Sequence, residues 1–109
     1  MFKATTDRRF TARCKAFVPV NGGHREEPFK ATFRVLDTEQ LENYDLTNKM
    51  GTDDFLRAVI MELDEIGDEQ GNPVPYSEDL RDVVMNDPMA RTALIRGYFD
   101  NISKGRKGN

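Results

Sequence analysis

The chain has 109 residues, a formal net charge of −3 and a single cysteine. This length predicts one domain with a modest core, and the single cysteine excludes an internal disulfide. We find no apolar run long enough to span a bilayer and no signal-peptide pattern, so we expect no membrane partner.

Charge is strongly segregated along the chain. Residues 1–34 carry eight Lys or Arg against three acids, residues 35–90 carry three against fifteen, and residues 91–109 carry five against one. Fields of opposite sign on one small body favour oriented association with charged partners or with further copies, so we expect self-association. The simpler interpretation is that each block is only a solvated face.

Two stretches of alternating hydrophobicity predict an antiparallel β-ribbon over about residues 9–36, joined by a long loop from Val20 to Pro28. Period two places Cys14 on the inner side, where we expect a buried thiol. The residues predicted to face inward are Phe10, Ala12, Cys14, Ala16, Val18, Phe29, Ala31, Phe33 and Val35. The basic residues predicted on the outer face are Arg9, Arg13, Lys15, Lys30 and Arg34.

The rest of the chain, about residues 38–102, has helical signals. Asp37 and Gln40 have capping-box spacing, Thr52 and Ser77 are predicted N-caps, and Asn86 or Asp87 caps a last helix. The stripe predicted for the helix that begins at Thr52 is Phe55, Leu56, Val59, Ile60 and Leu63. The stripe predicted for the last helix is Leu94, Ile95, Tyr98, Phe99 and Ile102.

These patterns define an α+β fold class, with an N-terminal antiparallel β-hairpin packed on a small bundle of about four helices. Residues 1–103 form a single domain in this prediction. The basic residues 104–109 contain no hydrophobic side chain, and we expect them to be a disordered tail.

The stretch from Asp68 to Tyr76 is a predicted structural junction within the helical part. Gly71 adopts a positive φ at little cost, while Pro73 and Pro75 each fix one φ and remove an amide donor. An acidic turn followed by an extended segment should therefore direct Tyr76 inward, just before the helix capped by Ser77.

This junction and the segments after it resemble the tail assembly chaperones of long-tailed (siphovirus-like) bacteriophages. The matching residues are Gly-Asn-Pro-Val-Pro-Tyr-Ser-Glu-Asp-Leu at 71–80, Val83-Val84, Asp87-Pro88 and Ala-Leu-Ile-Arg-Gly-Tyr-Phe at 93–99. The resemblance extends through the N-terminal hairpin to nearly the whole chain. One departure is that the family often has Trp where this chain reads Glu62-Leu63-Asp64.

The resemblance implies a protein that binds the tape measure protein, keeps it soluble and promotes assembly of the tail tube around it. The partners it implies are the tape measure protein and the major tail tube protein. The expected location is the cytoplasm of the bacterial host, and the protein is not expected in the mature virion.

No group of residues has the pattern of a catalytic, cofactor or metal site, so we do not expect an enzyme. His24 is the only histidine, and without a second imidazole or a cysteine partner it does not form a credible metal or acid–base site. The acidic run at residues 64–71 fails the calcium-loop pattern, because aligning Gly71 with the loop glycine puts Ile66 at the first ligand position.

The candidate partner-binding residues are Arg13, Lys15, Lys30, Arg34, Ile95 and Phe99. The alternative function is a small nucleic-acid-binding protein that uses the basic face of the ribbon, because a two-stranded ribbon can enter a DNA major groove. The acidic middle of the chain argues against nucleic acid, since it repels phosphates. The simpler interpretations are a hydrated ribbon face and a last helix whose stripe is entirely core.

Overall fold

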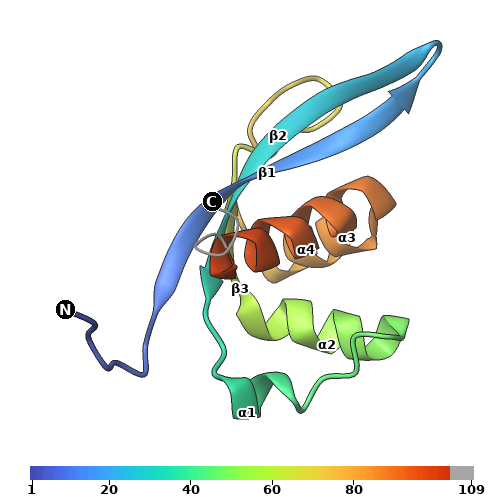
Figure 1. Ribbon diagram of the computed structural model, residues 1–109. Coiled ribbons are helices and arrows are strands. Elements are labelled where there is room, and N and C mark those ends of the chain that lie inside the picture. Colours follow the sequence, from blue (N-terminus) through green and yellow to red (C-terminus); the bar gives the residue numbers. More distant parts are fainter. Residues whose placement is uncertain (104–109) are drawn as a thin grey trace.

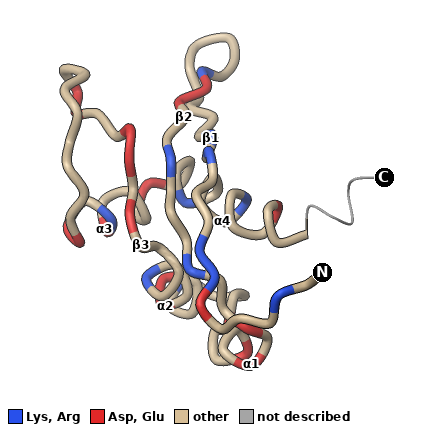
Figure 2. The backbone as a smooth tube through the Cα atoms, turned by 90° about the vertical axis from the view of Figure 1, so that its left-hand side faces the viewer, with Lys and Arg blue, Asp and Glu red and all other residues tan. Residues whose placement is uncertain are grey.

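A three-stranded antiparallel sheet in the order β1-β2-β3 forms one layer of the computed structural model, which describes residues 1–103 (Figure 1). The strands are β1 (Arg9–Val20), β2 (Gly23–Arg34) and β3 (Ile60–Asp64), and the helices are α1 (Thr38–Leu41), α2 (Lys49–Val59), α3 (Glu78–Asn86) and α4 (Pro88–Ile102). Helices α2, α3 and α4 cover one face of the sheet (Figures 1 and 2). The predicted α+β class with an N-terminal hairpin is confirmed; the predicted disordered tail at 104–109 lies outside the described residues.

The hairpin between β1 and β2 is longer and its turn is tighter than predicted. Pairing runs without interruption from Arg9 opposite Arg34 to Val20 opposite Gly23, so the turn contains two residues, of which Gly22 has a φ of 85°. The predicted loop over residues 20–28 is therefore wrong. Pro28 fits inside the strand because its register position directs the backbone nitrogen away from β1. The missing N–H of proline therefore removes no hydrogen bond between β1 and β2.

Strand β3 was not predicted, because Ile60 and Leu63 were assigned to a helical stripe. Both are buried, but they lie on a strand whose register against β2 shifts between Thr32 and Phe33. Residues three apart normally point to opposite faces of a strand. The β-bulge places both on the core side, so this bulged strand imitates the spacing of a helix.

The start of α2 also differs from the prediction. Asn48, not Thr52, is the N-cap, and its side-chain oxygen accepts a hydrogen bond from the Gly51 amide at 2.8 Å. The Thr52 hydroxyl lies inside the helix and donates to the Asn48 carbonyl at 2.8 Å. The segment from Lys49 to Gly51, predicted as loop, is therefore the first turn of α2.

The other predicted helix caps are confirmed. Asp37 and Gln40 form a reciprocal capping box at α1. The Ser77 hydroxyl accepts from the Leu80 amide at 3.0 Å to start α3. Asp87 caps α4, with Pro88 at the first helical position.

The core lies between the sheet and the helices and is centred on aromatic rings. Tyr98 of α4 makes edge contacts with Phe33 of β2 and Phe55 of α2, at centroid distances of 5.5 and 5.2 Å. Its hydroxyl accepts a hydrogen bond from the Leu36 amide at 3.0 Å, so the polar end of the buried ring has a partner. Cys14 is buried as predicted, with 1% of its surface exposed.

Candidate protein-binding surface

The predicted junction is an ordered turn. The Asp68 carboxylate accepts hydrogen bonds from the Gln70 and Asn72 amides, both at 2.9 Å, and Gly71 has a φ of 84°. Pro73 pairs with Gly67 in an isolated β-bridge, Pro75 is exposed, and Tyr76 is half-buried against the core. Tyr76 is thus directed inward as predicted, and it is half-buried rather than fully buried.

The predicted basic face exists on the side of the sheet opposite the helices. Arg13, Lys15, Lys30 and Arg34 are all exposed. The register places Arg13 directly opposite Lys30, and Arg9 directly opposite Arg34, so basic residues pair across β1 and β2 (Figure 2).

Strand β3 changes the charge of this face on one side. Asp64 pairs with Lys30, Glu62 pairs with Thr32, and the Glu65 carboxylate lies 3.2 Å from the Lys30 ammonium. These acids lie beside β2 and offset its positive charge, whereas within residues 1–103 no acidic strand lies on the outer side of β1 (Figure 2). The sequence did not indicate this neutralisation, because β3 was assigned to a helix.

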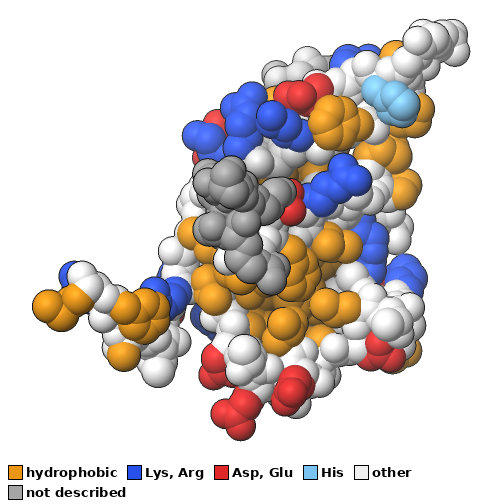
Figure 3. All heavy atoms as spheres, in the orientation of Figure 1, with side chains coloured by type: hydrophobic (Ala, Val, Ile, Leu, Met, Phe, Trp, Pro, Cys, Tyr) orange, Lys and Arg blue, Asp and Glu red, His pale blue; other side chains and the backbone are white. Residues whose placement is uncertain are grey.

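Ile95 and Phe99 belong to a stripe on α4 that is partly core and partly surface. Both are half-buried, while Ile102, seven residues after Ile95 on the same helix, is 50% exposed. The Phe99 ring stacks on Phe55 of α2 at a centroid distance of 5.4 Å, so the stripe runs along the contact between the two helices. Hydrophobic side chains gather over this region in Figure 3, between acidic side chains below and basic side chains above.

The outer edge of β1 is an open sheet edge. No strand of the described residues pairs with it, because β2 occupies the other side. The Val35 amide donates to the Arg8 carbonyl at 2.9 Å, which fixes the even-numbered residues of β1 as those that bond to β2. The amides of the odd-numbered residues therefore face the open edge. These residues are Arg9, Thr11, Arg13, Lys15 and Phe17.

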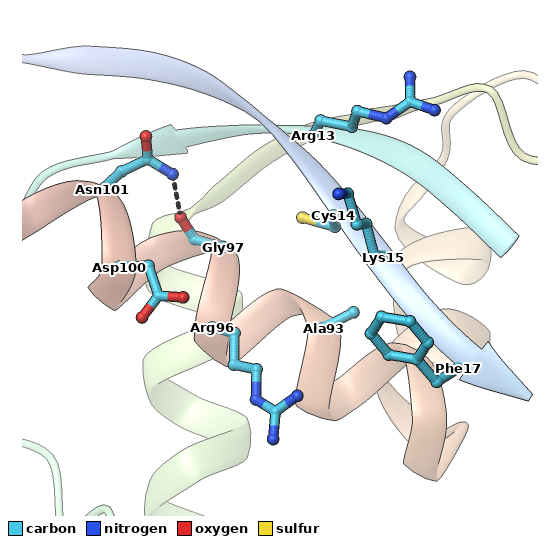
Figure 4. Close-up of a pocket in the computed structure, with 9 residues that line it drawn as sticks. All are labelled: Arg13, Cys14, Lys15, Phe17, Ala93, Arg96, Gly97, Asp100 and Asn101. Carbon is cyan, nitrogen blue, oxygen red and sulfur yellow. Dashed lines mark hydrogen bonds between the residues drawn. The ribbon is translucent and has the colours of Figure 1, made fainter. Parts of the chain in front are cut away.

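A groove of about 350 Å³ runs between this edge and α4 (Figure 4). Its floor is Cys14 and Gly97, where the helix approaches the strand closely. The thiol points toward Gly97, and the Phe17 ring lies near Ala93 at one end (Figure 4). The groove is lined by Arg13, Cys14, Lys15, Phe17, Ala93, Arg96, Gly97, Asp100 and Asn101.

Only Arg13 and Lys15 of the groove were among the predicted site residues. Lys30 and Arg34 lie on the neighbouring strand, and Ile95 and Phe99 lie on a different face of α4. Sequence reasoning missed Phe17, Arg96 and Asn101. The available signal was the glycine at position 97, since a glycine inside a helix often has a packing reason such as a close approach.

The Cys14 thiol on the groove floor is not a reactive group at neutral pH. Burial raises its pKa from 9.0 to about 11, because the thiolate is poorly solvated there. The thiol is therefore in its protonated form at neutral pH.

His24 is exposed near the tip of the hairpin. Within residues 1–103, no three His, Cys, Asp or Glu side chains are grouped so that they could hold a metal ion. No helix in the described part of the chain is long and apolar enough to cross a membrane. Comparisons with protein-family models, with curated proteins and with solved structures found no match to this chain.

Proposed function

We propose that this protein is a phage tail assembly chaperone that binds the tape measure protein, keeps it soluble and promotes assembly of the tail tube around it. The proposal rests on the resemblance of the chain to that family, from the hairpin to the helix at residues 88–102. It places the protein in the cytoplasm of the bacterial host, with the tail tube protein as a second partner.

The observation that carries the proposal is the apolar stripe of α4. A long helical protein without its tube exposes apolar stripes of its own, and reversible cover needs modest apolar patches with charged rims. Ile95 and Phe99 are half-buried and Ile102 is half-exposed, so the stripe can contact a helix without unfolding its own core. A helix lying in an apolar groove is a common mode of recognition.

The test is co-expression with a tape measure protein from the genome that encodes this chain. We expect the tape measure protein to be soluble and to co-purify only when this chain is present. Ile102→Asp should abolish co-purification, whereas Val20→Asp, at another exposed aliphatic residue, should not. A tape measure protein that stays insoluble, or one that is soluble without this chain, would overturn the proposal.

The second candidate function is binding of duplex DNA by the basic ribbon. Its support is the direct opposition of Arg13 to Lys30 and of Arg9 to Arg34. The acids of β3 on the same face count against it, because they repel phosphates. This candidate expects a gel shift of duplex DNA that weakens as salt rises and is lost in Arg13→Glu; the chaperone proposal expects no shift.

A further inference from the structure

We propose that the groove between β1 and α4 binds an extended, acidic segment of a partner protein, which adds to the sheet as a fourth strand along β1. This inference does not depend on the partner being the tape measure protein. It concerns a surface separate from the α4 stripe, and it names a different mode of recognition.

Within the described residues, the backbone of β1 offers unpaired hydrogen-bonding groups along its open edge. Five amides face the open edge, from Arg9 to Phe17, and Pro19 beyond them has none. An open edge can accept an extended peptide through main-chain hydrogen bonds, and the pockets beside it then select alternate side chains. The bound segment would therefore extend over the part of β1 before Pro19.

Helix α4 forms a wall beside the open edge and limits the side chains that the added strand can carry on that side. Gly97 has no side chain, and Cys14 opposite it is small, so the groove floor is shallow and uncharged (Figure 4). Ala93 and Phe17 make one end apolar. Side chains of the added strand that point toward α4 should accordingly be small or aliphatic.

The charge around the β1 edge favours an acidic occupant. The added strand would place its alternate side chains on the outer face of the sheet, beside Arg9, Arg13 and Lys15, all of which are exposed. Arg96 adds a further positive charge to the groove lining, against the single acid Asp100. Opposite charges on neighbouring strands are favourable, so those positions should be Asp or Glu.

The same charges disfavour a second copy of this chain as the occupant. Antiparallel pairing of two β1 edges around a two-fold axis would set Arg9, Arg13 and Lys15 of one copy among the same residues of the other. Like charges that face each other across strands are destabilising. The occupant that the edge fits is therefore an acidic strand of another protein.

The experiment uses the full chain and fluorescein-labelled nine-residue probes in fluorescence polarisation. The acidic probe alternates Glu and Val, and the basic probe alternates Lys and Val. Two further probes have the acidic sequence with N-methyl groups on alternate residues, one probe for each phase, so that each lacks donors on one edge. We expect the basic probe and one N-methylated phase to bind at least tenfold more weakly than the acidic probe.

Variants and hydrogen exchange locate the site. Arg13→Glu should weaken binding of the acidic probe at least tenfold, whereas Arg34→Glu, the same charge change on β2, should weaken it less than threefold. The amides of Thr11, Arg13 and Lys15 should gain protection from exchange when the acidic probe is bound. Circular dichroism of each variant checks that it is folded.

Three outcomes would overturn the proposal. One is equal binding of the acidic and basic probes, and another is binding without protection of the β1 amides. The third is protection of these amides in the protein alone together with a doubled mass in sedimentation, which would assign the edge to a second copy.

Discussion

The two strands of the hairpin share an alternating pattern with basic residues on the outer face, but their outer edges have different surroundings. Beyond β2 lies β3, which pairs with residues Lys30 to Phe33 and brings acids onto the outer face. Beyond β1 no strand of the described residues follows. The hairpin thus has one edge that is covered and neutralised over Lys30 to Phe33, and one that is open and basic.

This difference shows that an alternating strand does not reveal by itself whether its edge is available. The covered edge is decided by residues 60–64, about 30 positions further along the chain. Natural proteins usually protect open edges with charge or proline. The β1 edge has both, with Arg and Lys along it and Pro19 near the tip.

The largest expected effect comes from placing proline on each edge in turn. Thr11 and Thr32 face each other across β1 and β2, and their hydroxyls are 2.9 Å apart. The Thr32 amide faces β3, so Thr32→Pro removes a ladder bond in the central strand and should cost about 3 kcal/mol, the upper end for a hydrogen-bond partner left unsatisfied. The Thr11 amide faces the open edge, so Thr11→Pro should cost only about 1 kcal/mol.

Urea unfolding followed by circular dichroism measures both losses. The pair is matched, because each variant loses the same hydroxyl contact and gains the same ring. Equal losses would mean that the two edges are equivalent, which would contradict the comparison.

The second largest expected loss of stability comes from the contact between α4 and β1, since no strand of the described residues pairs with the outer edge of β1. A methyl group added at Gly97 would lie 2.7 Å from the Cys14 sulfur, so in Gly97→Ala either this sulfur or α4 must shift. We expect a loss of about 2 kcal/mol, since overpacking outweighs the gain of about 1 kcal/mol from alanine in a helix.

Cys14→Ala provides the control for this substitution, because it removes the sulfur that the new methyl group meets. In a double-mutant cycle, the two substitutions together should cost less than the sum of the single losses by at least about 1 kcal/mol. Additive losses would show that the contact between α4 and β1 does not decide the stability of this side.

The fold was predictable to the extent that local signals decide it. Alternation gave both strands of the hairpin, and the side-chain oxygens of Asp37, Ser77 and Asp87 marked three helix starts. The bulged strand β3 was not predictable from local spacing, because Ile60 and Leu63 have the spacing of a helix. Only their pairing with Phe33 and Ala31 of β2 shows that they lie on a strand.

The candidate site was less predictable than the fold. Arg13 and Lys15 were predicted from alternation, which places them on the outer face of β1. The groove also needs Arg96 and Gly97, some 80 residues away, and only tertiary packing brings α4 beside β1. Whether a strand edge is open depends on where all the other strands lie, so no local sequence pattern predicts it.

A third prediction concerns alkaline pH and the inner side of β1. Burial raises the pKa of Cys14 from 9.0 to about 11, so the folded protein keeps this proton where the unfolded chain has lost it. The contribution of the protonated thiol to stability is therefore complete below pH 9 and is lost as pH rises from 9 towards 11. Burial also raises the pKa of Tyr98, which acts in the same direction at higher pH.

Urea midpoints measured between pH 8 and 11 should fall less steeply in Cys14→Ala than in the unmodified chain. The difference between the two curves isolates the thiol, because Tyr98 titrates in both. Identical slopes would mean that Cys14 is well solvated and that the groove floor is open to water.

The smallest expected effect lies at the covered edge, where β3 ends. Glu65 has a φ of 62°, and it is the only residue other than glycine with a positive φ among residues 1–103. An L-residue in this region costs about 1–2 kcal/mol, and glycine relieves that cost. Glu65→Gly also removes the ion pair with Lys30, but both side chains are nearly half-exposed, so this pair contributes little. We expect a net gain of about 0.5 kcal/mol in the free energy of unfolding.

Glu65→Ala is the control, since it loses the same ion pair and keeps the strained φ, and it should be no more stable than the unmodified chain. Because this substitution strengthens only the side of the sheet next to β3, binding of the acidic probe to the β1 edge should not change. A change in that binding would mean that the two edges are coupled through β2 rather than independent.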